Sequence, residues 1–338
     1  MEHRPGGAPA VAGPAVAVGH AADPPRGWAS MTWRAHRPLL RRVLIAGALL
    51  IAAGLLWRYA RLVEWHEVGA AIAGYPPQRL AAAMLASVAA YACYCGFDVL
   101  ARAYTGHRLR LRRVLAIAFV SYAFVLNLGG VVGGFGLRYR LYSQAGLGVA
   151  TIARIAVFAV ASNWSGVLLL GGLAFTLERV PLPEAWAFAV IALRIAGIAM
   201  LVLLASYLGL CAFSRRRRWS ARGHEIELPS LPIAVTQVAV AATGWLAIAM
   251  ILWLLMPDGV RYLAVAGTLL LSVLANLVIR VPANLGVLEA VFLATLGPQF
   301  GTPLVLAAVL TFRAVFHIGP LLLALAVYLL FEVRARRP

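Results

Sequence analysis

Residues 276–297 read NLVIRVPANLGVLEAVFLATLG, an apolar stretch that a proline, an asparagine and a glycine interrupt. Residues 127–148 read NLGGVVGGFGLRYRLYSQAGLG and combine an asparagine with a run of glycines and two arginines. In lipid, backbone polar groups must be bonded internally, so irregular backbone persists only where protein or a wet cavity surrounds it. If apolar spans surround these two stretches, each marks a broken helix inside a membrane protein.

The composition of the whole chain supports a membrane protein. Of its 338 residues, 62% are apolar and 12% are charged. A soluble domain has about half of its residues apolar and about a quarter charged. Disordered chains have low hydrophobicity, so a disordered chain is excluded as well. We therefore expect a polytopic membrane protein with an all-α fold.

Apolar segments long enough to cross a bilayer recur along the chain. A crossing helix needs about 20 predominantly apolar residues. A weaker apolar piece, Leu285–Leu296, follows the proline-containing break. The candidate spans are Val43–Leu62, Leu80–Ala101, Val114–Leu128, Thr151–Leu177, Ala185–Phe213, Leu231–Met256, Tyr262–Ile279 and Pro303–Phe331.

Arginine clusters beside these spans predict the orientation. Cytoplasmic loops carry an excess of basic residues, so four arginine clusters are expected in the cytoplasm. If 114–128 crossed fully, the cluster at 215–222 would fall outside. If 262–279 crossed fully and the weaker piece 285–296 did not, the C-terminal cluster would fall outside. Both conflicts disappear if 114–148 and 262–300 are re-entrant hairpins, which enter and leave the bilayer on one side. The four clusters are Arg34 to Arg42, Arg102 to Arg113, Arg215 to Arg222 and Arg334 to Arg337.

With two hairpins, the chain divides into two inverted repeats, each of three transmembrane helices plus one re-entrant hairpin. Residues 37–178 form the first membrane repeat and residues 179–333 the second. Residues 1–36 are rich in alanine, proline and glycine and are expected to form a disordered cytoplasmic tail. Residues 334–338 form a basic cytoplasmic tail. Inverted repeats with broken helices that meet near the midplane are typical of transporters.

Ionisable residues within the apolar segments are the candidate functional residues, because charge inside a membrane is costly. A guanidinium group matches a phosphate bidentately, so arginines around the hairpins predict a cavity for a phosphate-bearing head group. The alternative is internal pairing, of Glu289 with Arg313 or Arg280, with other arginines placed at the ends of spans. The candidates for substrate binding are Arg138, Arg140, Arg280, Glu289, Arg313, His317 and Arg154.

Two further residues have more than one interpretation. His317 lies one helical turn after Arg313 and suits a packed histidine, a proton carrier or a hydrogen-bond partner. Asp98 has Arg102 four residues later, a spacing that predicts a local helical ion pair.

Other classes of function find little support. The sequence contains no metalloprotease, nucleophile-elbow or P-loop motif, so we expect neither an enzyme nor a bound cofactor. The arginine clusters lie beside spans, which argues against nucleic acid as a partner. Cys93, Cys95 and Cys211 lie in apolar spans without metal or disulfide spacing, and we expect ordinary packing there.

The two opening stretches, extended to NLGGVVGGFGLRYRLYSQAGLG-x5-R and VPANLGVLEAVFLATLG-x15-R, resemble the signature regions of a known family. This is the lysylphosphatidylglycerol synthase transmembrane (flippase-domain) family, and the likeness is greatest to its stand-alone, YbhN-like branch without the aminoacyl-transferase domain. The resemblance covers about residues 35–333. The resemblance implies a membrane domain that, in the larger members of the family, moves aminoacylated phospholipid across the bilayer. Larger members tend to have an acidic residue directly after the glycine of the first signature that corresponds to Gly136. In this chain Leu137 follows Gly136, and this difference favours an anionic phospholipid as substrate.

The sequence therefore predicts a lipid transporter, either a flippase or a scramblase, in a bacterial inner membrane with both termini cytoplasmic. Its substrate would be a phosphate-bearing phospholipid. The alternative is a non-transporting accessory or scaffold protein for lipid or envelope biosynthesis, whose partners would be lipid-synthesis enzymes. No motif for ATP binding is present, so a gradient or lipid asymmetry would drive any transport, or the transport would use no energy source. The sequence does not fix the oligomeric state.

Overall fold

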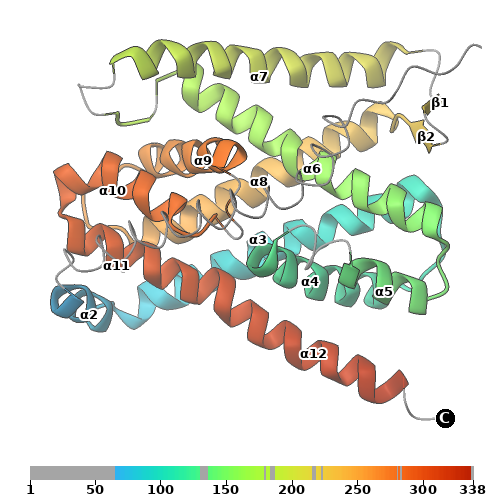
Figure 1. The fold of residues 1–338 in the computed structure, drawn as a ribbon, viewed down its shortest axis with the longest axis horizontal. Coiled ribbons are helices and arrows are strands. Elements are labelled where there is room, and N and C mark those ends of the chain that lie inside the picture. Colours follow the sequence, from blue (N-terminus) through green and yellow to red (C-terminus); the bar gives the residue numbers. More distant parts are fainter. Residues whose placement is uncertain are drawn as a thin grey trace, which may run out of the picture. The chain divides into compact units, whose positions relative to one another are not determined.

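The computed structural model describes residues 65–129, 136–178, 180–182, 187–214, 218–221, 224–279, 281 and 284–335. This part of the chain is almost entirely helical (Figure 1). Seven of its helices are long and apolar enough to cross a membrane by length and composition. The prediction of a helical polytopic membrane protein is confirmed to that extent. The expected first span, 43–62, and the expected tail at 1–36 lie outside the described residues.

Among the first five described helices, those at 77–105, 111–128 and 149–176 follow predicted segments closely, whereas the short helices at 65–73 and 137–144 were not predicted. Pro77 stands in the first turn of α3, where its missing N–H is not needed. Gly106 ends that helix in a left-handed conformation, with φ of 71°, and its N–H bonds to the carbonyl oxygen of Arg102. The helices are α2 (Trp65–Ala73), α3 (Pro77–Thr105), α4 (Leu111–Leu128), α5 (Leu137–Gln144) and α6 (Val149–Thr176).

The later part of the chain contains the remaining elements. A two-stranded antiparallel ribbon, β1 and β2, was not expected from the sequence. Thr302–Leu330 is one continuous apolar helical stretch of 29 residues with a π-helical turn inside it. The elements are α7 (Ala187–Phe213), β1 (Arg218–Ala221), β2 (His224–Glu227), α8 (Leu231–Leu255), α9 (Tyr262–Ile279), α10 (Val287–Phe300), α11 (Thr302–Phe312), the π-helical turn η4 (Arg313–Ile318) and α12 (Gly319–Ala335).

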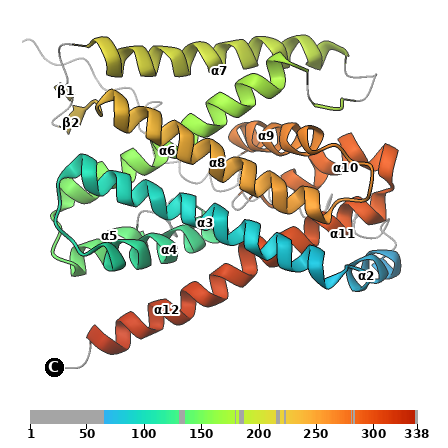
Figure 2. The same cartoon turned by 180° about the vertical axis from the view of Figure 1, so that it is seen from behind.

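Small residues allow the long helices to pack closely. A Cβ at Gly166 on α6 would lie 2.7 Å from the backbone of Ala241 on α8, and one at Gly244 would lie 3.0 Å from Cys93 on α3. Membrane helices associate through such small residues because lipid gives no hydrophobic drive between them. In Figures 1 and 2, α3 and α8 lie side by side in both views. The three cysteines are free, as expected.

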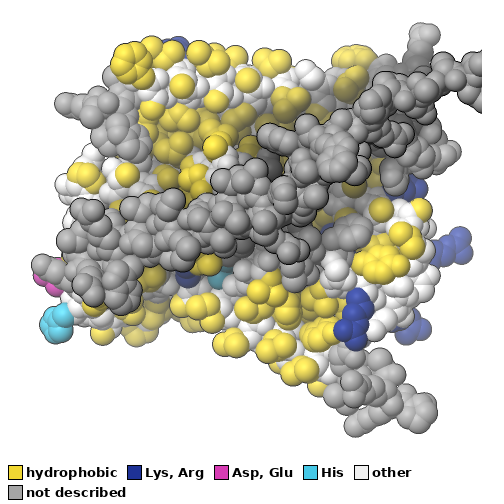
Figure 3. Space-filling model, viewed as in Figure 1, with side chains coloured by type: hydrophobic (Ala, Val, Ile, Leu, Met, Phe, Trp, Pro, Cys, Tyr) yellow, Lys and Arg dark blue, Asp and Glu magenta, His cyan; other side chains and the backbone are white. Residues whose placement is uncertain are grey.

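The outer surface of the helices is apolar. On α7, Phe188 is 90% exposed and Phe213 is 87% exposed. Figure 3 shows apolar side chains across the visible face, with most of the visible arginines toward one end. Soluble monomers rarely expose apolar patches of this extent. The surface suits a bilayer as its solvent.

Candidate functional site

The π-helical turn η4 interrupts the long C-terminal helix near its middle. It begins at Arg313 and ends at Ile318. Such turns are rare and occur often at functional sites, because the wider helix leaves room for other groups to approach its backbone. Side chains of α3 and α4 hydrogen-bond to backbone carbonyl oxygens of this turn, at Val315, Phe316 and His317, and the α9–α10 segment contacts the Arg313 side chain.

Glu289 and Arg313 form an ion pair at this turn. Arg313 donates from Nε to Glu289 Oε1 and from Nη2 to Glu289 Oε2, the second at 2.9 Å. The Arg313 side chain is 11% exposed and that of Glu289 is 17% exposed. The N–H of Gly286 donates to Glu289 Oε2 at 2.9 Å, so the carboxylate also caps α10. The predicted pairing of Glu289 with Arg313 is confirmed, whereas Arg280, its other suggested partner, lies outside the described residues.

Asparagines support the broken segment between α9 and α10. Asn284 has φ of 55°, a left-handed conformation that asparagine tolerates better than most residues. Its carbonyl oxygen accepts a bond from Arg313 Nη2 at 2.9 Å, and its Nδ2 lies 3.4 Å from Ser272 Oγ on α9. Asn276 Oδ1 accepts a hydrogen bond from the N–H of Val281 at 3.0 Å. Polar backbone near this break is therefore bonded within the protein.

The end of α4 contacts the same π-helical turn from the other broken segment. Asn127 Nδ2 donates to the carbonyl oxygen of Ala123 at 2.8 Å and to that of His317 at 3.1 Å. The His317 ring packs edge-on against Phe312 and Phe316, with ring centroids 5.4 Å and 5.2 Å apart. Its Nδ1 is buried and has no hydrogen-bond partner among the described residues. The turn η4 thus joins both broken segments.

A second charged cluster lies between α3, α4 and α5. Arg138 Nη2 lies 3.3 Å from Asp98 Oδ2, and Tyr142 donates its hydroxyl to Asp98 Oδ1 at 2.7 Å. Asp98 is fully buried and Arg138 is 4% exposed. The predicted ion pair of Asp98 with Arg102 is wrong. Arg102 instead donates from Nε to the carbonyl oxygen of Leu109, and the buried carboxylate takes a partner 40 residues later in the chain.

Arg138 also forms part of an aromatic stack. Its Cζ lies 4.7 Å from the centroid of the Tyr122 ring, which stacks on Tyr94 with centroids 4.8 Å apart. In the loop after α3, burial lowers the pKa of His107, and the charge of Arg102 adds to that shift. His107 packs edge-on against Tyr142, 6.3 Å between centroids.

A cavity of ≈ 220 Å³ adjoins Arg138. Two buried polar atoms on its lining residues have no hydrogen-bond partner among the described residues: the Tyr122 hydroxyl and Asn163 Oδ1. Neither residue was a candidate from the sequence. Asn163 could have been found as an amide in the middle of an apolar span, whereas Tyr122 gave no signal. The lining residues are Tyr94, Tyr122, Val125, Leu126, Arg138, Ala156, Ala159, Val160, Asn163 and Trp164.

The remaining candidate arginines lie elsewhere. Arg140 is exposed and donates to the Tyr328 hydroxyl on α12 at 2.8 Å. Arg154 pairs with Glu227 at 2.8 Å, and its Cζ lies 5.1 Å from the centroid of the Tyr104 ring. The described candidates are therefore distributed over separate contacts, with only Glu289, Arg313 and His317 together at η4.

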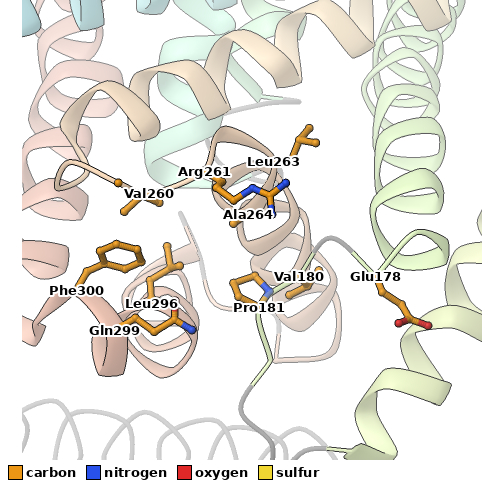
Figure 4. Close-up of a pocket in the computed structure, with 11 residues that line it drawn as sticks. Glu178, Val180, Pro181, Val260, Arg261, Leu263, Ala264, Leu296, Gln299 and Phe300 are labelled. Carbon is orange, nitrogen blue, oxygen red and sulfur yellow. The ribbon is translucent and has the colours of Figure 1, made fainter.

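Another cavity lies where the α8–α9 connection meets the end of α10. It has a volume of ≈ 350 Å³, and its lining includes Arg261, Gln299 and Phe300. In Figure 4, Val180 and Pro181 approach it from the chain after α6, and the Glu178 carboxylate points away from the other labelled residues. Glu178 pairs with Arg194, at 3.5 Å.

Comparison with known proteins identifies the family. No family model matches the chain. It is 40% identical, over 306 residues, to the inner membrane protein YbhN of Escherichia coli (strain K12); the match covers 90% of this chain and 95% of that protein. The chain belongs to the YbhN family. It is also 30% identical over 317 residues to the uncharacterized protein slr0712 of Synechocystis sp., covering 90% of this chain and 96% of that one.

The family and the apolar helices together give the location. The relative with 40% identity is an inner membrane protein, and seven described helices are long and apolar enough to cross a bilayer. The chain is a multi-pass inner membrane protein. The part of the sequence resemblance that concerned the YbhN-like branch is confirmed.

Proposed function

We propose that this protein is a phospholipid transporter, a flippase or scramblase, that moves a phosphate-bearing head group across the inner membrane. One observation carries the proposal: two broken segments, from different halves of the chain, meet at the π-helical turn. The α9–α10 segment contributes Glu289 to a partly buried pair with Arg313, and Asn127 at the end of α4 bonds to the carbonyl oxygen of His317. Broken helices that meet near the midplane at a charged site are a transporter design. A protein that only holds partners together has no need of charge there.

The depth of the two tips supports re-entrant hairpins. In the helical stretch Thr302–Leu330, His317 lies 15 residues from the start and 13 from the end. The tip contacts of Asn127 and of Asn284 reach this middle region. A helix of 29 residues is about 44 Å long, enough to span the bilayer. Segments whose tips reach its middle, α4–α5 and α9–α10, are therefore proposed to enter and leave on one side.

The order of elements supports the inverted repeat. A long helix, a two-helix segment and another long helix follow one another twice: α3, α4–α5 and α6, then α8, α9–α10 and the helix that contains η4. In Figures 1 and 2, the α4–α5 segment and the α9–α10 segment extend from the central region toward opposite ends. Each segment is proposed to open to a different side of the membrane. A conformational change at the tip of one hairpin would then give a head group access to the Glu289–Arg313 pair from the leaflet on that side.

The arginine count still orients the molecule. Exposed arginines lie in the connection between α3 and α4 and in the first turn of α4, at residues 108, 110, 112 and 113. We propose that this end is cytoplasmic, together with both termini, and that the cavity lined by Arg261 faces outside. The α4–α5 hairpin then opens to the cytoplasm and the α9–α10 hairpin to the outside.

The resemblance to the lysylphosphatidylglycerol synthase transmembrane family supports the lipid as substrate. The chain carries no ATP-binding motif, so the proposed transport uses a gradient or equilibrates lipid passively. The main rival is an accessory protein that binds lipid-synthesis enzymes without transport. Neither role needs an enzymatic centre or a cofactor.

Purified protein in liposomes distinguishes transporter from scaffold. Fluorescent phosphatidylglycerol and phosphatidylethanolamine are incorporated, and a membrane-impermeant reductant bleaches the outer leaflet. Transport predicts that the label in the inner leaflet becomes accessible faster than in protein-free liposomes, with or without an imposed ion gradient. If both lipids remain in their leaflets under every gradient tried, the transporter proposal fails and the scaffold remains.

A further inference from the structure

The cavity beside Arg138 has the size of a lipid head group. Its volume is ≈ 220 Å³, and α3, α4, α5 and α6 all contribute to its lining. Cavities that enclose drug-sized ligands measure about 300–1,000 Å³, so a complete phospholipid does not fit. Val160 lines the cavity and is 59% exposed on the apolar surface of α6. A lipid can therefore place its head group inside while its acyl chains stay in the bilayer.

The cavity is electrically neutral in spite of its arginine. Arg138 is the only formally charged side chain among the described lining residues, and Asp98 lies behind it, 3.3 Å away and fully buried. A buried charge that lacks compensation is strongly unfavourable. A head group with a net negative charge would leave such a charge, whereas a zwitterionic head group would not.

Hydrogen-bonding groups in the cavity also differ from those of a simple anion site. Asn163 Oδ1 and the Tyr122 hydroxyl lie buried without partners among the described residues, and Tyr122 is 6% exposed. An amide oxygen only accepts, so it requires a donor from the ligand. An ammonium group supplies three donors, and the Trp164 and Tyr94 rings that line the cavity suit a cation.

We propose that this cavity binds a zwitterionic phosphodiester head group of the phosphoethanolamine class, with the phosphate at Arg138 and the ammonium at Asn163 and Tyr122. The inference rests on the proposed function, since it names the lipid that such a transporter would take. It replaces the sequence-based expectation of an anionic lipid. That expectation rested on Leu137, at a position where larger members tend to have an acidic residue, and did not include the Asp98 carboxylate that pairs with Arg138.

Lipid binding by the full-length protein in detergent tests this proposal. Short-chain phosphatidylethanolamine and phosphatidylglycerol with identical acyl chains are titrated separately, and bound lipid is measured by native mass spectrometry and by the shift in unfolding temperature. We expect the ethanolamine lipid to bind about tenfold more tightly, the ratio that one charged hydrogen bond supplies. Equal or tighter binding of phosphatidylglycerol would overturn the proposal.

Tyr122→Phe removes only a hydroxyl that lies beside Arg138 and Asp98 and that makes no full hydrogen bond among the described residues. This variant should therefore keep the unfolding temperature of the lipid-free protein but lose phosphatidylethanolamine affinity about tenfold. Tyr207→Phe is the matched control, because its hydroxyl bonds to Gln237 Oε1 at 2.7 Å and does not line the cavity. Unchanged affinity in Tyr122→Phe would contradict the assigned ammonium contact.

Asp98→Asn tests the charge balance directly. The amide keeps an acceptor for Tyr142 but leaves Arg138 with a net positive charge, so the preference should reverse toward phosphatidylglycerol. If this variant does not fold, the proposal is still tested by the affinity of Tyr122→Phe and by the preference of the wild type for phosphatidylethanolamine over phosphatidylglycerol. Ethanolamine-selective binding without translocation in liposomes would refute the transporter and leave this site in place. Translocation without ethanolamine selectivity would refute the site and leave the transporter.

Discussion

Replacing Arg313 by glutamine should destabilise the protein strongly. The change removes two hydrogen bonds to Glu289 and one to the carbonyl oxygen of Asn284. It leaves a carboxylate that is 17% exposed with only the Gly286 N–H as a described hydrogen-bond donor. Breaking one side of a buried ion pair costs about 3–5 kcal/mol, and we expect Arg313→Gln to fall in this range.

Glu289→Gln should have a smaller effect, about 3 kcal/mol, because a glutamine oxygen still accepts from Gly286 or from Arg313. In the double variant both charges disappear together, so much of the loss should be recovered. The coupling energy of the double-mutant cycle should be about 2–3 kcal/mol in favour of the pair. Unfolding of the purified protein in mixed micelles with a denaturing detergent measures all four variants.

The exposed pair of Arg194 with Glu178 provides the control. Their side chains are 60% and 54% exposed, at a separation of 3.5 Å. Exposed ion pairs contribute about 0–1 kcal/mol because solvent screens them, so Arg194→Gln should leave stability almost unchanged. Additive effects at Glu289 and Arg313, with single variants no worse than this control, would refute the argument for a buried, mutually dependent pair.

Two other predictions follow from packing and from orientation. Gly166→Ala places a Cβ 2.7 Å from the backbone of Ala241 and should destabilise the protein by about 1–3 kcal/mol, measured by thermal unfolding. Gly209→Ala, where nothing lies within 4 Å, should be neutral or stabilising, and an equal loss in both variants would exclude the contact as the cause. A cysteine at Ala335 should react with a membrane-impermeant maleimide only from the cytoplasm, and one at Asp258 only from outside. Labelling of residue 335 from the periplasm would rule out the second re-entrant hairpin and the inverted repeat with it.

The sequence predicts the helices well because their signal is local. The apolar segments expected at 151–177 and 231–256 correspond to α6 and α8 within a few residues. Length and hydropathy alone define such a segment. The ribbon of β1 and β2 was missed, because eight polar-rich residues between two spans give no apolar run.

Partners far apart in the chain are harder to predict. The expectation that charges inside the membrane pair with one another related Glu289 to Arg313 or Arg280, and the structure confirms the contact with Arg313. The i, i+4 spacing predicted that Asp98 pairs with Arg102, but this rule applies only to neighbouring side chains on one helix. The true partner, Arg138, lies on α5, and only the packing of α3 against the α4–α5 segment brings it to the carboxylate. The π-helical turn likewise depends on contacts that spacing does not reveal.

The rate of lipid translocation by the double variant Glu289→Gln/Arg313→Gln tests the central claim most directly. The variant is compared with the wild type in liposomes at equal amounts of folded protein. Our account predicts wild-type protein that translocates phospholipid and a double variant that folds but does not exceed protein-free liposomes. Translocation by the double variant at the wild-type rate would contradict it, because the pair would then serve only the stability of the fold.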